Sequence, residues 1–231
     1  MPRRPRMYLP GIPVHLIQRG NNHQPCFFTV EDCNFYLECL DRSLTRYQVQ
    51  LHAYVLMTNH VHLLVTPAEE EGISRMMALL GCHYVTYMNR RYQRTGTLWE
   101  GRHRSSLVDA EDYLFRCYRY IELNPVRAGL VNHPEEYRWS SYHHNALGIR
   151  NAMITEHALY LGLSIEEHLR HSYYKELFKR ELSARDIAII HNTLNQNFPL
   201  GNDRFRKEIE QTLRRRLGYE LRGRPFAFSS G

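Results

Sequence analysis

Short apolar runs alternate with longer helical patterns in the N-terminal part of the chain. Four of these runs predict strands, at residues 14–19, 51–57, 60–65 and 98–108. The first run ends at Gly20-Asn21-Asn22, whose composition is typical of a turn. Only Thr58 and Asn59 separate the second run from the third, so these two strands are expected to form a hairpin.

Apolar residues at helical spacing occupy the segments between these strands. Residues 31–46 and 73–93 predict two helices. A third is expected to follow Asp109, a favourable N-cap residue with Asp112 three positions later. The order of elements is then β-α-β-β-α-β-α, which is the ferredoxin-like arrangement. We therefore expect an α+β fold in which the helices cover one face of an antiparallel sheet.

The rest of the chain has helical patterns and a basic end. A boundary is indicated at residues 144–154, where a polar stretch containing Gly148 follows an aromatic cluster. The expected organisation is an α+β domain, a C-terminal helical extension and a basic tail, at residues 1–148, 149–216 and 217–231. Two residue pairs in the extension fit the pattern of helix N-caps: Ser164 with Glu167, and Ser183 with Asp186.

The composition is that of a globular protein. The 231 residues are 43% hydrophobic and 23% charged, and no apolar run is long enough to span a membrane. The five cysteines are odd in number and include no C-x-x-C pair. Reduced thiols in a cytoplasmic protein fit this usage, and neither a disulfide framework nor a thiolate zinc site is indicated.

The identity of the cationic residues says more than the net charge of +6. Of 30 Lys and Arg residues only three are Lys, at positions 175, 179 and 207. Guanidinium groups bind phosphate in a bidentate way and stack on bases, so an Arg-rich chain suits nucleic acid. A GC-rich genome, whose codons favour Arg over Lys, is the alternative explanation. The 16 Tyr and nine Phe supply rings on which bases could stack, although most aromatic residues are expected in the core.

The first candidate for chemistry is His60-Val61-His62, at the start of an apolar strand. Side chains alternate along a strand, so the two imidazoles point to the same side from Cα atoms roughly 6.6 Å apart. They could converge on one divalent ion while Val61 packs on the other side. A pair of structural histidines held by hydrogen bonds is the alternative, and the spacing leaves both open.

The second candidate is the helix over residues 112–125. One face carries polar-tipped side chains, and another carries an apolar stripe of Leu114, Tyr118 and Ile121. The polar face is formed by Tyr113, Cys117, Tyr120 and Asn124. Tyr118 is therefore expected in the core, while the geometry does not choose between Tyr113 and Tyr120. Asn124 precedes a proline, which disfavours helix, so its side chain could cap the helix, turn inward or ligate a metal.

Several arginines lie near these motifs and are candidate phosphate contacts, with a solvated charged face as the alternative. They are Arg19, Arg102, Arg104, Arg116, Arg119 and Arg127. On the expected strand over residues 98–108, Arg102 and Arg104 would share a face. Trp99 is expected in the hydrophobic core rather than stacked on a nucleic-acid base. In the tail, Arg222-Gly223-Arg224-Pro225 matches the core of an AT-hook, whose arginines lie in a narrow minor groove.

Three stretches of sequence together resemble the one-tyrosine HUH transposases of small insertion sequences. They are residues 59–64, residues 98–106 and residues 120–129. The REP-associated tyrosine transposases are similar in addition at Arg19-Gly20-Asn21-Asn22. The resemblance covers about residues 8–145, in order and with suitable spacing, and no catalytic residue is carried over to the C-terminal part.

The resemblance implies an enzyme that cuts and transfers single-stranded DNA. His60 and His62 would be metal ligands, Tyr120 the nucleophile, and Asn124 a third ligand one turn later. Insertion-sequence relatives usually have Gln at this place, and the shorter Asn departs from that pattern. A divalent ion, Mg²⁺ or Mn²⁺, would assist the formation of a 5′-phosphotyrosine. The implied DNA sites are REP-like palindromic hairpins, and the implied location is the cytoplasm, in association with the nucleoid.

Other functions remain open at this point. A domesticated protein that binds REP-like hairpins without cutting them would have the same fold. A replication initiator or relaxase is a weaker variant, because such enzymes usually have further domains or a second tyrosine. Both a monomer and a homodimer are compatible with the resemblance.

Overall fold

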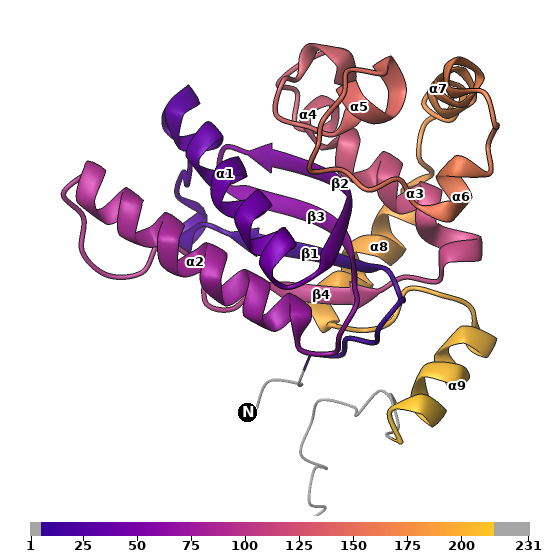
Figure 1. Ribbon diagram of the computed structural model, residues 1–231, viewed down its shortest axis with the longest axis horizontal. Coiled ribbons are helices and arrows are strands. Elements are labelled where there is room, and N and C mark those ends of the chain that lie inside the picture. Colours follow the sequence, from indigo (N-terminus) through magenta and orange to yellow (C-terminus); the bar gives the residue numbers. More distant parts are fainter. Residues whose placement is uncertain (1–5, 215–231) are drawn as a thin grey trace, which may run out of the picture.

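The computed structural model describes residues 6–214, which are built around a four-stranded antiparallel sheet (Figure 1). The strands are β1 Val14–Arg19, β2 Val49–Met57, β3 His60–Pro67 and β4 Arg104–Leu107. They lie in the order β2-β3-β1-β4, the ferredoxin-like order that the sequence predicts. The α+β fold class is therefore confirmed, and so is the hairpin of β2 and β3 around Thr58 and Asn59.

The fourth strand is much shorter than predicted, and one consequence drawn from its length is wrong. Trp99 makes only an isolated bridge to Gly20, and the N–H of Gly101 donates to the carbonyl of Trp99 over 2.8 Å. Gly101 has a φ of 69°, a left-handed conformation that ends the extended chain in a tight turn. Arg102 follows this turn and precedes β4, so it does not share a strand face with Arg104.

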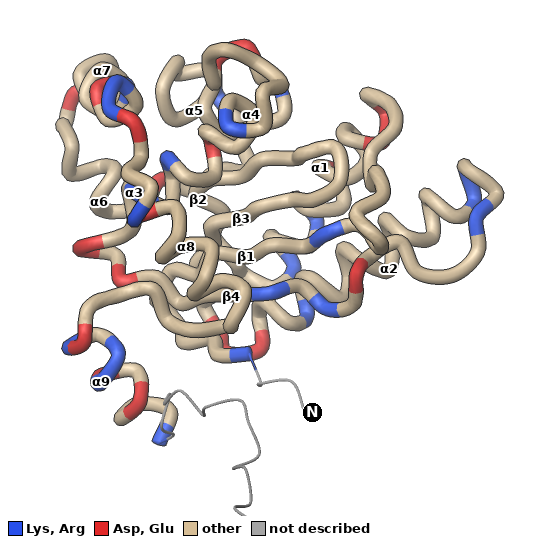
Figure 2. Tube along the Cα trace, turned by 180° about the vertical axis from the view of Figure 1, so that it is seen from behind, with Lys and Arg blue, Asp and Glu red and all other residues tan. Residues whose placement is uncertain are grey.

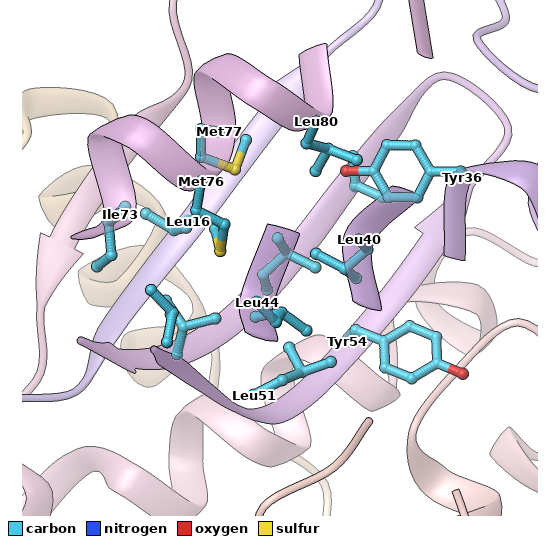
Figure 3. Packing of buried hydrophobic residues seen from close by; sticks show 14 of the residues in the cluster. Leu16, Tyr36, Leu40, Leu44, Leu51, Tyr54, Ile73, Met76, Met77 and Leu80 are labelled. Atoms are coloured by element: carbon cyan, nitrogen blue, oxygen red, sulfur yellow. The ribbon is translucent and has the colours of Figure 1, made fainter. Parts of the chain in front are cut away.

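Two long helices, α1 Val30–Arg46 and α2 Gly72–Arg91, pack side by side on one face of the sheet (Figure 1). α1 begins at a capping box in which the carboxylate of Asp32 accepts the backbone N–H groups of Phe28 and Thr29. The core between these helices and the sheet consists largely of aliphatic, methionine and tyrosine side chains. Figure 3 shows Leu16 of β1, Leu40 of α1 and Met76 of α2 packed together there.

The third helix lies on the opposite face, so the expectation of helices on one face holds only for α1 and α2. α3, Ala110–Glu122, starts after Asp109 as predicted and is followed by one turn of α4, Asn124–Arg127. Leu114, Cys117 and Ile121 of α3 share a buried cluster with Val55 of β2 and Leu64 of β3. β2 and β3 are buried along nearly their whole length, which requires cover on both faces.

The C-terminal part is helical, as predicted, and most of it packs on the same face as α3, whereas Phe198 and Ile209 join the core of α1 and α2. Its helices are α5 Tyr142–Leu147, α6 Ala158–Leu161, α7 Glu167–Glu176, α8 Ala184–Gln196 and α9 Asp203–Thr212; short 3₁₀ turns are at Asn21–His23 and Pro134–Glu136. Tyr160, Tyr174 and Ile190 join the α3 cluster, so this core continues across residue 148. No helix within residues 6–214 is long and apolar enough to cross a membrane.

The two predicted caps in this part have different outcomes. Ser183 is the N-cap of α8, where its hydroxyl accepts the N–H of Asp186 and donates to the carboxylate of Asp186. Ser164 is not a helix cap, because α7 begins only at Glu167, after Glu166. The predicted division at residue 148 stays a prediction. The AT-hook residues Arg222 and Arg224 lie outside the described residues.

Later segments of the chain run along both outer strands of the sheet. On β2, the N–H of Leu56 donates to Trp139, and the carbonyl of Leu51 accepts the N–H of Thr155. On β4, the N–H of Leu200 donates to Leu107 over 2.7 Å. The C-terminal part is therefore hydrogen-bonded to the sheet as well as packed against it.

Candidate active site

The two histidines of the H-x-H motif lie at the start of β3, directly after the hairpin turn. Their rings are on the α3 side of the sheet with centroids 5.1 Å apart, as the strand alternation predicts. Gly20 shapes this end of the sheet: its N–H donates to the carbonyl of Asn59 over 2.8 Å. A Cβ at Gly20 would lie 2.2 Å from the carbonyl oxygen of Gln24, so only glycine fits this loop.

The side chain of Asn59 determines which nitrogen of His60 carries the proton. Asn59 donates its amide N–H to the carbonyl of His23, which turns the amide oxygen toward His60. His60 Nδ1 lies 2.7 Å from that oxygen and must donate to it. The lone pair of His60 is therefore on Nε2.

Both imidazoles are neutral at physiological pH. Burial and, to a smaller extent, the charge of Arg19 lower the pKa of His60 to about 4. Burial also places the pKa of His62 well below its usual value, with His15 and His60 as additional causes. Neutral imidazole is the form that binds a metal ion.

Tyr120 of α3 lies against this pair of imidazoles. Its ring meets the ring of His62 edge-on, with centroids 5.7 Å apart. The residue is only 4% exposed, yet no protein group within residues 6–214 bonds the hydroxyl, and that oxygen is not among the buried unpartnered atoms. The phenol oxygen is thus free to accept a substrate contact.

The other tyrosines of α3 lie away from the imidazoles, which favours Tyr120 over Tyr113 in the choice that the sequence left open. Tyr113 contacts the guanidinium of Arg116, 4.8 Å from its ring centroid, and has no ring contact with a histidine. Tyr118 is fully buried against Tyr160 and Tyr174, in the core as predicted. Within α3, the structure brings only Tyr120 to the imidazoles.

Asn124 caps the end of α3. Its amide N–H donates to the carbonyl of Tyr120 over 2.9 Å, and its oxygen accepts a hydrogen bond from Arg127 over 3.2 Å. The Arg127 guanidinium also lies over the Tyr120 ring, 4.2 Å from the centroid, and donates to the Tyr120 carbonyl. Asn124 and Arg127 together hold Tyr120 at the helix end. A metal-binding role for Asn124 remains a prediction.

Of the six predicted phosphate contacts within residues 6–214, Arg127 lies against Tyr120 and Asn124, and the other five fall into two groups. Three arginines hold the C-terminal helices: Arg116 pairs with Asp186 over 2.9 Å, Arg119 donates to the carbonyl of Arg180, and Arg104 donates to the side chain of Asn195. Arg19 is half-buried opposite His60 in the sheet, and Arg102 is exposed. Figure 2 shows Lys and Arg positions gathered near the ends of β1 and β4. Trp99 is buried against Tyr36 and Tyr84, as expected for a core residue.

His15 of β1 belongs to the site and was missed by the sequence reasoning. It is fully buried, its Nε2 lies 2.9 Å from Nδ1 of His62, and its ring centroid lies 5.6 Å from that of Tyr120. Burial lowers the pKa of His15 to about 3. An imidazole within an otherwise apolar strand was the available signal, because such a group needs a hydrogen-bond partner.

Glu122 is a second buried group that the sequence reasoning missed. Ser141 and Asn145 donate to one carboxylate oxygen, and Tyr174 donates to the other over 2.7 Å. None of these donors is charged, and burial raises the pKa of Glu122 to about 7. The carboxyl group ties α3 to α5 and α7.

The donor atoms at this site fit one divalent ion. Nδ1 of each ring in the H-x-H pair is bonded to the protein, and Nε2 of each has no protein partner among the described residues. No set of three His, Cys, Asp or Glu side chains in residues 6–214 is placed to hold one ion. A divalent ion held by these two imidazoles would need its other ligands from oxygen atoms, and the metal site remains a prediction.

Comparison with known proteins places this geometry in a family. Residues 9–124 match the family described as "Transposase IS200 like". The fold is similar to a REP-associated tyrosine transposase solved bound to a REP hairpin, with a TM-score of 0.55 and 17% identity over 68% of this chain and 93% of that chain. A putative transposase from Deinococcus radiodurans is 19% identical over 58% of this chain and 97% of that chain, with a TM-score of 0.35.

None of the curated proteins matches the sequence. The family match covers both histidines of the motif, Tyr120 and Asn124, and half of the chain. The similar structure supports the same fold. The resemblance inferred from the sequence motifs is thereby confirmed: the chain belongs to the IS200-like transposase family.

Proposed function

We propose that this transposase cleaves and rejoins single-stranded DNA through a covalent bond to Tyr120. The observation that carries the proposal is the contact between the Tyr120 ring and His62, beside two neutral imidazoles with free Nε2 atoms. A nucleophile and a cation site side by side are what phosphoryl transfer to a side chain requires.

In the proposed reaction, the Tyr120 oxygen attacks the phosphorus of the scissile phosphodiester. A bond forms between that oxygen and phosphorus, and the bond from phosphorus to the 3′ oxygen breaks. The products are a 5′-phosphotyrosine and a 3′-hydroxyl, and the proton lost by the phenol balances the proton gained by the 3′ oxygen. The ester keeps the energy of the broken bond, so the reverse attack by a 3′-hydroxyl rejoins DNA without ATP.

His60 and His62 would hold a divalent ion, with Asn124 as the third ligand. Such an ion, Mg²⁺ or Mn²⁺, would polarise the phosphate and stabilise charge on the leaving oxygen. The amide oxygen of Asn124 accepts one hydrogen bond from Arg127, which leaves its second lone pair for the ion. Arg127 meanwhile keeps the Tyr120 ring in place through the stacking contact.

The proposed DNA substrate is a REP-like hairpin with its single-stranded flank. The support is the similarity in fold to a REP-associated transposase that was solved with a REP hairpin. An unpaired flank can present its phosphate in line with the phenol, which a regular duplex does not allow. Arg19, which lies opposite His60 in the sheet, and Arg102, which is exposed, are the proposed phosphate contacts.

The test is a covalent-adduct assay on a labelled hairpin oligonucleotide with a single-stranded flank. With Mn²⁺, the wild-type protein should give a band that survives denaturation, and a chelator should remove it. Tyr120→Phe should abolish this band and keep hairpin binding in a mobility-shift assay. Tyr113→Phe is the matched control on the same helix and should retain the adduct.

Two outcomes would contradict the proposal. Loss of the adduct in Tyr113→Phe but not in Tyr120→Phe would identify another nucleophile. Tight hairpin binding by the wild type with no adduct in Mn²⁺ or Mg²⁺ would instead support a hairpin-binding protein that no longer cuts.

A further inference from the structure

His15 is the third imidazole at the candidate site, and the reaction proposed above gives it no role. It lies on β1, beside β3 in the sheet, and its side chain is fully buried. Its Nε2 atom is 2.9 Å from Nδ1 of His62, a hydrogen-bond distance. Its other nitrogen, Nδ1, is buried and has no partner among residues 6–214.

The hydrogen bond between the two rings can be made in two ways. In one, Nδ1–H of His62 donates to Nε2 of His15, and the lone pair of His62 is on Nε2. In the other, Nε2–H of His15 donates to Nδ1 of His62, and the proton of His62 is on Nε2. Only the first arrangement leaves Nε2 of His62 able to bind a metal ion.

The first arrangement is the same as the one that Asn59 imposes on His60. There the amide oxygen of Asn59 accepts a hydrogen bond from Nδ1–H, so the lone pair of His60 lies on Nε2. A hydrogen-bond acceptor behind each ring would therefore give the two metal-facing nitrogens the same protonation state. Ligating histidines in metalloproteins commonly have such an acceptor behind the ring.

His15 is a poor choice for stability alone. When its Nε2 accepts a hydrogen bond, its own proton must lie on Nδ1, which has no partner among residues 6–214. An unpaired buried polar group costs about 1–3 kcal/mol, so His15 brings no net gain in stability over an aliphatic side chain, which would leave Nδ1 of His62 unpaired instead. The neighbours of His15 on β1, Val14 and Leu16, are buried aliphatic residues of this kind.

We propose that His15 is a positioning residue whose Nε2 accepts a hydrogen bond from Nδ1–H of His62 and thereby presents Nε2 of His62 to the divalent ion. His15 does not itself bind the ion, because its Nε2 is occupied by His62 and its Nδ1 is buried. The inference rests on the proposed function only in so far as His60 and His62 form a metal site.

The test compares two substitutions at this position in the full-length protein. In His15→Gln the side-chain amide oxygen can occupy the position of Nε2 of His15 and accept the hydrogen bond from Nδ1–H of His62. In His15→Leu the side chain has no acceptor. Mn²⁺ affinity, measured from the electron paramagnetic resonance of free Mn²⁺, should fall about 10–100-fold in His15→Leu. It should stay within about threefold of wild type in His15→Gln. The thermal midpoint of His15→Leu should lie close to that of the wild type, because an unpaired nitrogen on His15 is exchanged for one on His62.

A spectroscopic measurement on the wild type keeps the proposal testable if a variant fails to fold. In ¹⁵N-histidine-labelled protein with bound Mg²⁺ or Zn²⁺, the ring-nitrogen shifts should place the His62 proton on Nδ1. A His62 proton on Nε2, wild-type Mn²⁺ affinity in His15→Leu, or equal losses in the Leu and Gln variants would each overturn the proposal. His62→Ala separates the two proposals: if this variant also binds Mn²⁺ normally, the metal site itself is wrong.

Discussion

The two faces of the central sheet carry different kinds of core. Toward α1 and α2 the buried side chains of β3 are Val61, Leu63 and Val65, which pack among other apolar groups. Toward α3 the same strand presents His60 and His62 before it returns to apolar packing at Leu64. Neighbouring residues of one strand thus belong to the apolar core on one face and to the candidate site on the other.

The difference extends beyond the strand. On the α3 face the sheet and the helix bury His15 and Glu122, groups that cost free energy unless they are bonded. The C-terminal helices supply part of that bonding, through Tyr174 of α7. The α1 and α2 face therefore contributes mainly hydrophobic stability, and the α3 face combines the candidate site with a polar core that depends on the C-terminal part.

Substitutions at two adjacent residues of β3 test whether the two faces of the sheet have these different roles, and they have the largest expected effects. Leu63→Ala should lower the free energy of unfolding by about 2–5 kcal/mol, because it leaves a cavity in a fully packed core, and should retain the covalent adduct. His62→Ala should lower the adduct rate by about 100-fold or more, because it removes a ligand of the proposed ion. Urea unfolding and the adduct assay, each performed on both variants, check the pair.

A folded Leu63→Ala variant that makes no adduct would show that the two faces are not separable in this way. So would a His62→Ala variant that is destabilised as much as Leu63→Ala.

The next largest effect concerns the pH dependence of stability at Glu122. Its pKa rises from 4.5 to about 7 on folding, so between these values the folded chain keeps a proton that the unfolded chain has lost. Stability contributed by this residue should therefore fall as pH rises from 4.5 to 7, by about 3 kcal/mol. Glu122→Gln should remove this fall and be more stable than wild type at pH 8. Urea unfolding of both proteins at pH 5 and pH 8 measures this change in the free energy of unfolding.

Glu38→Gln, at an exposed position of α1, is the control and should leave the pH dependence unchanged. An unchanged slope in Glu122→Gln would mean that Glu122 is already ionised in the folded protein.

A smaller effect is expected where Arg127 stacks on Tyr120. Arg127→Lys loses the planar contact over the ring and the paired bonds to Asn124 and the Tyr120 carbonyl. The adduct rate should fall about tenfold, in line with a stacking contact worth about 1–2 kcal/mol. Arg116→Lys alters the equivalent stack on Tyr113 and should change the rate less than twofold. Equal effects of the two variants in a single-turnover assay would contradict a specific role of Arg127.

The smallest predicted effect tests how the C-terminal part is joined to the sheet. Ser183→Ala removes the N-cap of α8 and should cost about 1 kcal/mol. Because this part shares the α3 core, unfolding followed by fluorescence and by circular dichroism should remain one transition. Two separate transitions would instead support an independent unit beyond residue 148.

Strong local patterns predicted most of the fold. The apolar runs at β1, β2 and β3 and the two-residue turn at Thr58 and Asn59 are properties of short segments. β4 was overestimated because a tight turn at Gly101 looks, in sequence, like a glycine within a strand. The side of the sheet taken by α3 was missed, because the sequence of a strand that is buried on both faces does not indicate which helix lies on which face.

The site was predictable only in part, because some of its residues come together through contacts between distant segments of the chain. His60, His62 and Tyr120 belong to motifs, whereas His15 enters the site through the register of β1 against β3, a contact between residues 47 apart. The partners of Arg104, Arg116 and Arg119 lie in α8 and in the loop at residue 180. Where these segments pack cannot be deduced from the local sequence around the arginines.

The covering of both outer strands has a consequence for how this protein behaves when shortened. Edge strands with unpaired N–H and C=O groups can pair with strands from other molecules. Here residues from the segments 139–155 and 197–200 of the same chain occupy those edge positions. A truncation that keeps the family motifs but ends soon after Asn124 would expose both edge strands. Such a fragment should self-associate through its sheet, so insolubility of the shortened protein would reflect lost edge protection rather than a defective catalytic centre.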